Sequence, residues 1–235
     1  MISQDDKKQL KLLEKKLGYS FKHKDLLKRA LTHKSYTNEL KLPPSQHNER
    51  TEFLGDAVLE LAISHLLMEK FKEHPEGELS KLRAAIVNEA QLADLARSIR
   101  LGDFLYLGKG EEQTGGRDKP SLLSDVYEAV LGAIYLDRGF QKAFQLVAKH
   151  FVEIIKKVGE EGFAKDYKTR LQEEVQSRFR SIPRYKMVKA VGPDHNKIFE
   201  INLYIQEELY GVGEGPSKKS AEQDAARQAL EKLTT

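Results

Sequence analysis

The chain has no cysteine among its 235 residues. This absence excludes a disulfide framework, a thiolate nucleophile and a thiolate zinc site, and it fits a reducing cytosol. No apolar run approaches the roughly 18 residues that a membrane span needs, and the opening segment, MISQDDKK, lacks the apolar core of a signal peptide. We therefore expect a soluble, cytoplasmic protein that does not enter a membrane.

The chain also lacks a large excess of either charge. It carries 39 Lys and Arg against 36 Asp and Glu, a net charge of +3. Residues 1–165 hold 27 basic and 25 acidic side chains and residues 166–235 hold 12 and 11, so the two parts contribute +2 and +1. Neither part has the overall basic character that is typical of nucleic-acid binding. A nucleic-acid site would therefore depend on where a few cations are placed.

What the sequence does contain is a stripe of acids inside an apolar helical pattern. Residues 48–59, NERTEFLGDAVL, predict an amphipathic helix that Glu49, Glu52 and Asp56 interrupt. At about 100° per residue, these steps of three and four place the three carboxylates on one face. Grouped like charges cost free energy unless a cation lies among them, so the stripe suggests a divalent-metal site. The alternative is a solvated acidic face, which is what most charged helix stripes are.

Glu60 shares this stripe but lies farther along the helix. At about 1.5 Å rise per residue it stands roughly 12 Å along the axis from Glu52, so one ion cannot readily bind both. We interpret Glu60 as an exposed acid, or one that lies outside the ligand set.

A second acidic pair lies in residues 121–136, an apolar segment that predicts a core helix. Asp125 and Glu128 are one turn apart in it, and core helices rarely carry acids without partners. Two core helices packed antiparallel would bring both acidic groups to one Mg²⁺ ion, which prefers oxygen ligands. Spacing alone leaves two alternatives open, a metal site or two unrelated surface faces.

Helical periodicity continues to about residue 158. Helices are predicted at residues 79–101, 121–136 and 140–158. Within the first of these, Asn88 and Gln91 resemble a cap and its reciprocal partner, and Gly102 is a fitting stop. Loops at residues 41–46 and 108–119 precede the two acidic helices, and the second loop, rich in glycine and charge, is expected to be mobile.

The period changes after residues 159–165, a polar link that contains glycine. A helix, three strands and a helix are predicted at residues 167–179, 184–191, 198–206, 208–213 and 217–233. We therefore expect a multi-domain protein, with an all-α domain at residues 1–158, a linker at 159–165 and an α+β domain of order α-β-β-β-α at 166–235.

The first part of the chain resembles ribonuclease III. Residues 48–59 resemble that family's signature helix, Asp125-Val126-Tyr127-Glu128-Ala129 resembles its second acidic motif, and the likeness extends from Leu17-Gly18-Tyr19 through Leu31-Thr32-His33 to the last helix. Thr51 stands where the family usually has Leu, a departure that changes no acid. The resemblance implies catalytic metal ligands at Glu52, Asp56, Asp125 and Glu128, with Glu49 as an outer member. Glu76 matches a position that the family associates with the catalytic valley of the partner subunit.

The α-β-β-β-α part resembles a double-stranded-RNA-binding domain. That resemblance implies RNA contacts at Gln172, Glu173, His195, Lys218, Lys219 and Ser220. Helix starts normally disfavour cations, so two lysines at residues 218 and 219 make sense if a phosphate binds there. Two exposed lysines near a helix start are also common without any function, and it is the motif KKSAEQDAA that favours the phosphate interpretation. Such a domain recognises the A-form shape of a duplex and not its sequence.

Together the resemblances imply an Mg²⁺-dependent endonuclease of double-stranded RNA, and Mn²⁺ suits the same oxygen ligands. The implied products have 5′-phosphate and 3′-hydroxyl ends with a short 3′ overhang, and the implied role is processing of ribosomal RNA precursors and messenger RNA. Because one acidic cluster cuts one strand, a two-fold homodimer accounts for both cuts. The helix face around Phe53 is a candidate part of that interface, with core packing as the competing use.

Three other functions are alternatives to the nuclease. The principal rival is a relative that binds double-stranded RNA without cutting it, and the presence of all four acids counts against it. A helical nucleotide phosphohydrolase would also use acids and Mg²⁺, but the chain has no His-Asp dipeptide and the C-terminal domain would have no purpose. A protein-interaction module leaves both acidic pairs unexplained.

Overall fold

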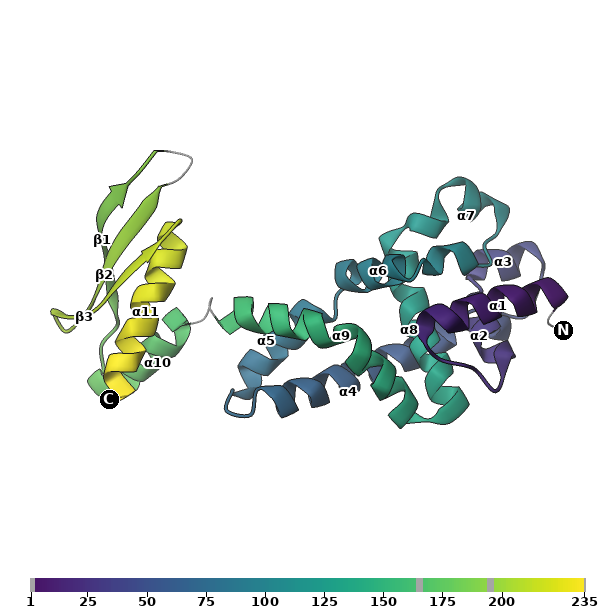
Figure 1. Cartoon of the computed structure of the whole chain (residues 1–235), viewed down its shortest axis with the longest axis horizontal. Helices are drawn as coiled ribbons and strands as arrows, with labels where there is room; N and C mark the ends of the chain where they lie inside the picture. The colour runs from purple at the N-terminus through teal and green to yellow at the C-terminus, as the bar shows by residue number, and fades with distance from the viewer. Residues whose placement is uncertain (1–2, 164–166, 194–196, 235) are drawn as a thin grey trace. The chain divides into compact units, whose positions relative to one another are not determined.

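A computed structural model gives the structure of the protein and describes residues 3–163, 167–193 and 197–234 (Figure 1). The chain forms two compact units, residues 1–156 and 157–235. The first unit is helical. Its elements are α1 (Gln4–Leu17), α2 (Lys24–Ala30), α3 (Lys34–Glu39), η1 (Pro44–Gln46), α4 (Glu49–Lys70), α5 (Glu76–Ile86), α6 (Glu89–Ser98), η2 (Leu101–Phe104), α7 (Lys109–Gln113), η3 (Gly116–Asp118), α8 (Pro120–Arg138) and α9, which begins at Phe140 and ends at Phe163. Within the described residues, no helix is long and apolar enough to span a lipid bilayer.

Helices α4 and α8 pack against each other at the centre of the first unit. A Cβ atom added to Gly55 would lie 1.8 Å from the carbonyl oxygen of Glu128, and one added to Gly132 would lie 2.1 Å from the carbonyl oxygen of Thr51. Residue numbers rise along α4 as they fall along α8, so the two helices run antiparallel, as the sequence predicts. Glycine at both positions allows this close backbone approach.

Helix α8 is buried along most of its length because α2, α4 and α6 surround it. Its far end is fixed by Asp137, whose side chain is fully buried. The carboxylate accepts hydrogen bonds from the Tyr19 hydroxyl at 2.8 Å and from the backbone N–H groups of Lys22 and His23 at 3.0 Å each. The turn after α1 is therefore tied to the end of α8.

The structure corrects two predicted helix boundaries. Residues 79–101 form two helices, because the Asn88 side chain accepts a hydrogen bond from the Gln91 N–H at 3.0 Å and thereby begins α6. Helix α9 runs to Phe163 and so takes up most of the segment predicted as a link. The glycines in that segment cost about 1 kcal/mol each in a helix, which is not enough to end it.

The segment 108–119, predicted as a loop, contains short helices. It forms α7 and η3, and Arg117 holds them in place. The guanidinium donates to Glu112 through Nε at 2.6 Å and Nη2 at 2.8 Å, and through Nη1 to the carbonyl oxygens of Gly102 at 2.8 Å and Leu105 at 3.1 Å. The two carbonyl acceptors, Gly102 and Leu105, precede the segment. The composition of residues 108–119 therefore could not reveal these hydrogen bonds.

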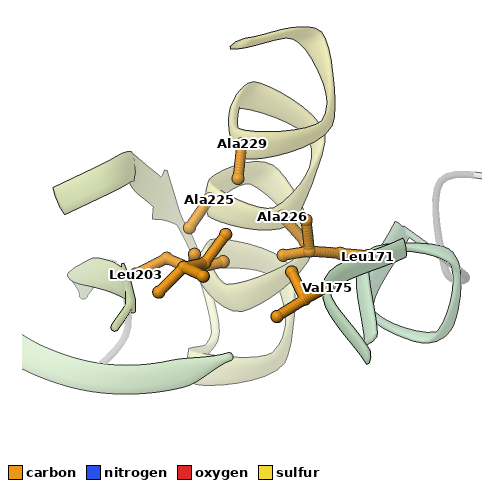
Figure 2. Packing of buried hydrophobic residues seen from close by; sticks show 7 residues of the cluster. Leu171, Val175, Leu203, Ala225, Ala226 and Ala229 are labelled. Carbon is orange, nitrogen blue, oxygen red and sulfur yellow. The ribbon is translucent and has the colours of Figure 1, made fainter. Parts of the chain in front are cut away.

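The second unit has the predicted order α-β-β-β-α. Its elements are α10 (Tyr167–Phe179), β1 (Arg184–Val191), β2 (Ile198–Ile205), β3 (Glu208–Gly215) and α11 (Lys218–Thr234), and the antiparallel sheet has the order β1-β2-β3. The helices and the sheet meet in an apolar core formed by Leu171, Val175, Leu203, Ile205, Ala225, Ala226 and Ala229 (Figure 2). Helix α11 lies directly on β3, because a Cβ at Gly213 would stand 2.1 Å from the carbonyl oxygen of Ala221.

Candidate active site and RNA-binding surface

The first turn of α4 is fixed by buried hydrogen bonds. The Asn48 N–H donates to the Thr32 carbonyl at 2.9 Å, and the Thr51 hydroxyl donates to the Asn48 carbonyl at 2.7 Å. Both Asn48 and Thr51 are buried. The departure at Thr51 from the family's usual Leu is therefore accommodated by a local hydrogen bond, and the helix that carries the first acids starts from a defined position.

The four predicted acids lie within electrostatic reach of one another where α4 and α8 pack. We call Glu52, Asp56, Asp125 and Glu128 the acidic cluster. Burial raises the pKa of Glu52 to about 7, and the charges of Asp125 and Asp56 add to this rise. Burial also raises the pKa of Glu128 to about 8, with further contributions from the charges of Asp56, Asp125 and Glu52. The pKa of Asp125 is likewise raised, mainly by burial.

The chemistry of the acidic cluster suits a hard divalent cation. Its side chains offer only carboxylate oxygens, and the raised pKa values show that negative charge is unfavourable at Glu52 and Glu128 without further positive charge. As the side chains stand, no three acids or histidines among the described residues are close enough together to hold an ion. The role of these four residues as ligands therefore remains a prediction.

One cation near the acidic cluster was not predicted from the sequence. Lys34, the first residue of α3, places its Nζ 3.1 Å from Glu49 Oε1. This contact raises the pKa of Lys34 and lowers that of Glu49, and the charges of Glu52 and Asp125 raise the pKa of Lys34 further. The sequence holds no pattern that would reveal the pair, since the two residues are far apart along the chain and meet only in the fold.

Two other acids considered from the sequence lie away from this contact. Glu60 is exposed, and of the groups that raise the pKa of Glu128 its charge makes the smallest contribution. Glu76 is exposed at the start of α5, where its Oε1 accepts a hydrogen bond from the Ser80 hydroxyl at 2.7 Å. The structure therefore supports the interpretation of Glu60 as an exposed acid.

The apolar face of α4 beside the acids is exposed and not buried. The side chain of Phe53 is 81% exposed, Leu61 58% and Met68 66%, and Ala57 between them is also exposed. Of the two uses predicted for the face around Phe53, core packing is therefore wrong, whereas Val58 in the same apolar pattern is buried. Four apolar residues on one stripe of a helix, all open to solvent, are typical of a protein–protein interface.

In the second unit, the predicted RNA contacts on α10 and α11 lie on a common surface. Lys168 Nζ contacts Glu222 Oε2 at 2.6 Å and joins the first turn of α10 to the second turn of α11. Gln172 is one turn after Lys168, and Lys218 is one turn before Glu222. Gln172, Glu173, Lys218 and Lys219 are all exposed. His195 lies outside the described residues.

Ser220 differs from the other predicted contacts because its hydroxyl is already engaged. It accepts a hydrogen bond from the Ser217 N–H at 3.0 Å and donates to the Ser217 carbonyl at 2.8 Å, while the Ser220 N–H donates to the Ser217 hydroxyl at 3.1 Å. Ser220 therefore shapes the start of α11, beside which Lys218 and Lys219 extend into solvent.

Comparison with known families gives two matches that together cover most of the chain. The family described as Ribonuclease-III-like matches residues 23–155, and the family described as Double-stranded RNA binding motif matches residues 167–233. The boundary between these matches falls near the end of α9.

Curated relatives are similar over nearly the full length. Ribonuclease 3 of Nitratiruptor sp. is 48% identical over 226 residues, which cover 96% of this chain and 97% of that protein. Ribonuclease 3 of Pelotomaculum thermopropionicum is 49% identical over 228 residues, covering 97% and 95%. A solved structure of the nuclease domain of ribonuclease III from Campylobacter jejuni, described as flexible in a region involved in dimer formation, is 49% identical with a TM-score of 0.56 and covers 61% of this chain and 99% of that one.

Proposed function

The chain belongs to the ribonuclease III family, and we propose that its acidic cluster is the site that cleaves double-stranded RNA. The protein is an endoribonuclease of RNA processing. The observation that carries the proposed site is the electrostatic coupling of four carboxylates on the packed helices α4 and α8, two of which have pKa values raised to about 7 and about 8. Charge concentrated in this way, at a cost to the fold, is typical of catalytic sites.

The family is metal-dependent, and the proposed ion is Mg²⁺, with Mn²⁺ as a substitute that accepts the same oxygen ligands. When bound, the ion would activate water as the nucleophile and offset the charge of the scissile phosphate and the leaving oxygen. The acidic cluster would hold it, and Glu49 would take part from the outside, since its carboxylate is shared with Lys34.

The residues of the cluster also set a pH requirement. Near neutral pH, Glu52 and Glu128 are partly protonated because burial and neighbouring charges raise their pKa values. They become full carboxylates when positive charge arrives, so binding of the cation releases protons and strengthens as the pH rises.

The second unit supplies the affinity for the duplex. Lys218 and Lys219 would contact phosphates, Gln172 and Glu173 would contact one minor groove, and His195 a second one. The contact between Lys168 on α10 and Glu222 on α11 supports part of this assignment, because it fixes the spacing between the proposed groove contacts on α10 and the proposed phosphate contacts on α11. The proposed domains are the nuclease at residues 1–158 and the RNA-binding domain at 166–235, joined by residues 159–165, of which 159–163 continue α9.

A duplex has two strands, and one acidic cluster per chain cuts one of them. The proposed assembly is therefore a homodimer, in which a two-fold axis relates two subunits and thus two acidic clusters. The exposed stripe around Phe53 supports it, since this stripe begins next to Glu52 on the same helix. Cleavage by the two subunits would leave 5′-phosphate and 3′-hydroxyl ends with a short 3′ overhang. The proposed location is the cytoplasm, where structured transcripts are processed.

One experiment separates this function from binding without cleavage. Labelled RNA duplex, single-stranded RNA and DNA duplex are incubated with the protein, each with Mg²⁺ or with EDTA. The nuclease cuts only the RNA duplex, and only with Mg²⁺. Binding of the RNA duplex without any cut under both conditions would instead identify a non-catalytic RNA-binding protein, and equal cutting of single strands would reject the proposed substrate.

A further inference from the structure

One pocket in the nuclease unit has no place in the proposed reaction. Its volume is about 360 Å³, and it lies between the end of α1, the turn at Gly18, the end of α8 and the first turns of α9. Arg138, which lines it, is ten residues after Glu128 on the chain, so the pocket is about 15 Å along α8 from the acidic cluster. Its volume falls at the small end of ligand pockets, which suits a molecule the size of a mononucleotide.

The pocket concentrates positive charge. Arg138, Lys142 and Lys149 line it, and none of the described lining residues is acidic. Arg138 Nε lies 3.7 Å from Oδ2 of the buried Asp137 carboxylate, which also accepts hydrogen bonds from Tyr19 and from backbone N–H groups. Three cations around one hollow repel one another, and an anion bound among them would offset this repulsion.

Neutral groups also orient these cations, beside the contact of Arg138 with Asp137. Lys142 Nζ donates to Gln145 Oε1 at 3.0 Å, and Arg138 Nη2 donates to the Ser20 carbonyl at 3.2 Å. Lys149 Nζ lies above Gly18, where an added Cβ atom would be only 3.1 Å away. Hydrogen bonds to amides and carbonyls orient a cation without cancelling its charge, so the charge remains available to a ligand.

Another pocket of this unit differs in charge. It is lined by Lys28 and Arg29, but Asp25 lines it too, and Lys28 Nζ is bound to Asp6 Oδ2 at 2.7 Å. Charge is therefore balanced there. A third hollow is lined by Arg29 and Arg50 and by no acid, so it has two lining cations, against three at Arg138, Lys142 and Lys149.

The remaining lining is apolar and aromatic. Leu17 and Leu146 are buried, and the Tyr19 ring lies beside the Arg138 guanidinium, 5.8 Å from ring centroid to Cζ. We propose that this pocket binds a phosphorylated small molecule of mononucleotide size. Its phosphate meets Lys142, Lys149 and Arg138, and its flat or apolar part lies against the leucines and the tyrosine.

The test uses the full-length protein in EDTA, so that divalent ions do not contribute. Binding of AMP, adenosine and inorganic phosphate is measured by isothermal titration calorimetry and by the shift in Tm. The double variant Lys142→Gln, Lys149→Gln removes two charges at the pocket, and Lys7→Gln, Lys8→Gln removes two exposed charges from α1 outside it. Circular dichroism and the ligand-free Tm confirm that each variant is folded.

AMP is expected to bind the wild type and the α1 variant with equal affinity. Its affinity for the pocket variant should be lower by about tenfold or more. Adenosine, which lacks phosphate, should not bind. Absence of AMP binding at millimolar concentration, or equal AMP binding by the pocket variant, overturns the proposal. If AMP does not bind but the pocket variant loses affinity for RNA duplex, the cations serve the duplex backbone and the small-molecule pocket is rejected. The cleavage assay on the wild type is independent of each of these outcomes.

Discussion

Gly55 on α4 lies against the backbone of Glu128 on α8, so closely that a Cβ atom on Gly55 would stand 1.8 Å from the Glu128 carbonyl oxygen. The contact that sets the spacing of the two helices therefore also places an acid of the proposed active site. Since carboxylates from both helices must converge, a change in helix spacing acts on the site directly.

Gly55→Ala is expected to lower both stability and cleavage. The added methyl group cannot fit, so the helices must separate, at a cost of about 1–3 kcal/mol or more. Thermal denaturation and duplex cleavage measure the two effects. Gly77→Ala is the matched control, because an added Cβ there meets nothing within 4 Å. Equal behaviour of the two variants would show that the close approach has no role.

Without divalent ions, the contribution of Glu52 and Glu128 to the stability of the protein should fall as the pH rises from about 5 to about 8. His33 and His150, whose pKa values burial lowers, act in the opposite direction in both the wild type and the variant below. The carboxyls of Glu52 and Glu128 ionise near 4.5 when unfolded but near 7 and 8 when folded. Between these values the folded state keeps protons that the unfolded state has lost, so rising pH favours unfolding. Both side chains are partly exposed, so each contributes less than about 1.4 kcal/mol per pH unit.

The measurement is Tm against pH in EDTA for the wild type and for the double variant Glu52→Gln, Glu128→Gln. The double variant should show a flatter profile and a higher Tm at pH 8, because it removes the destabilising charges. Asp137, whose pKa is lowered, loses its contribution only at more acidic pH and does not affect this window. Profiles of equal slope would contradict the assigned shifts.

Glu128→Gln alone should keep duplex binding and lose cleavage. The amide preserves the shape of the side chain but removes the charge of one ligand, so we expect a loss in cleavage rate of roughly 100-fold or more. Gel-shift affinity and single-turnover cleavage provide the two readouts. Glu60→Gln, a neutralisation at an exposed position, should retain cleavage. A parallel loss of binding and cleavage in the Glu128 variant would reject its role as a ligand.

Sequence reasoning succeeded where the information is local. The acids at steps of three and four are visible because helical period alone puts them on one face, and Asn88 is recognisable as a cap because its partner, Gln91, is three residues away. The exposure of Phe53 was not predictable, since an apolar residue at helical spacing has the same pattern whether it faces the core or a second copy of the chain.

Contacts between distant segments were beyond the same reasoning. Lys34 and Glu49 meet because α3 and the start of α4 are brought together by the fold. Arg117 reaches carbonyl oxygens of Gly102 and Leu105, whereas the composition of its own segment, with several glycines, indicates a loop. The cations of the pocket at Arg138 likewise come from α8 and α9 and lie around the turn after α1. Their spacing along the chain does not reveal this grouping.

Changing Lys218 and Lys219 to Ala should weaken duplex binding and reduce its salt dependence. Each lost phosphate contact lowers the slope of log K against log salt concentration by about 0.7–0.9. Filter binding at several salt concentrations measures the slope. Arg184→Ala with Lys186→Ala removes two exposed cations from β1 and should leave the slope unchanged. If both double variants reduce the slope equally, the start of α11 has no special role in phosphate binding.

Phe53→Ser should dissociate the proposed dimer without unfolding the subunit. The side chain is 81% exposed in the single chain, so its loss leaves no cavity in the core. In a two-fold dimer the change removes two buried rings at about 1.5–3 kcal/mol each, which weakens association by roughly 100-fold or more. Sedimentation velocity measures the assembly, and an unchanged monomer Tm shows that the fold is intact. Leu12→Ser, at an exposed position on α1, should remain dimeric, so a dimer that tolerates both changes would place the interface on another face of the nuclease unit.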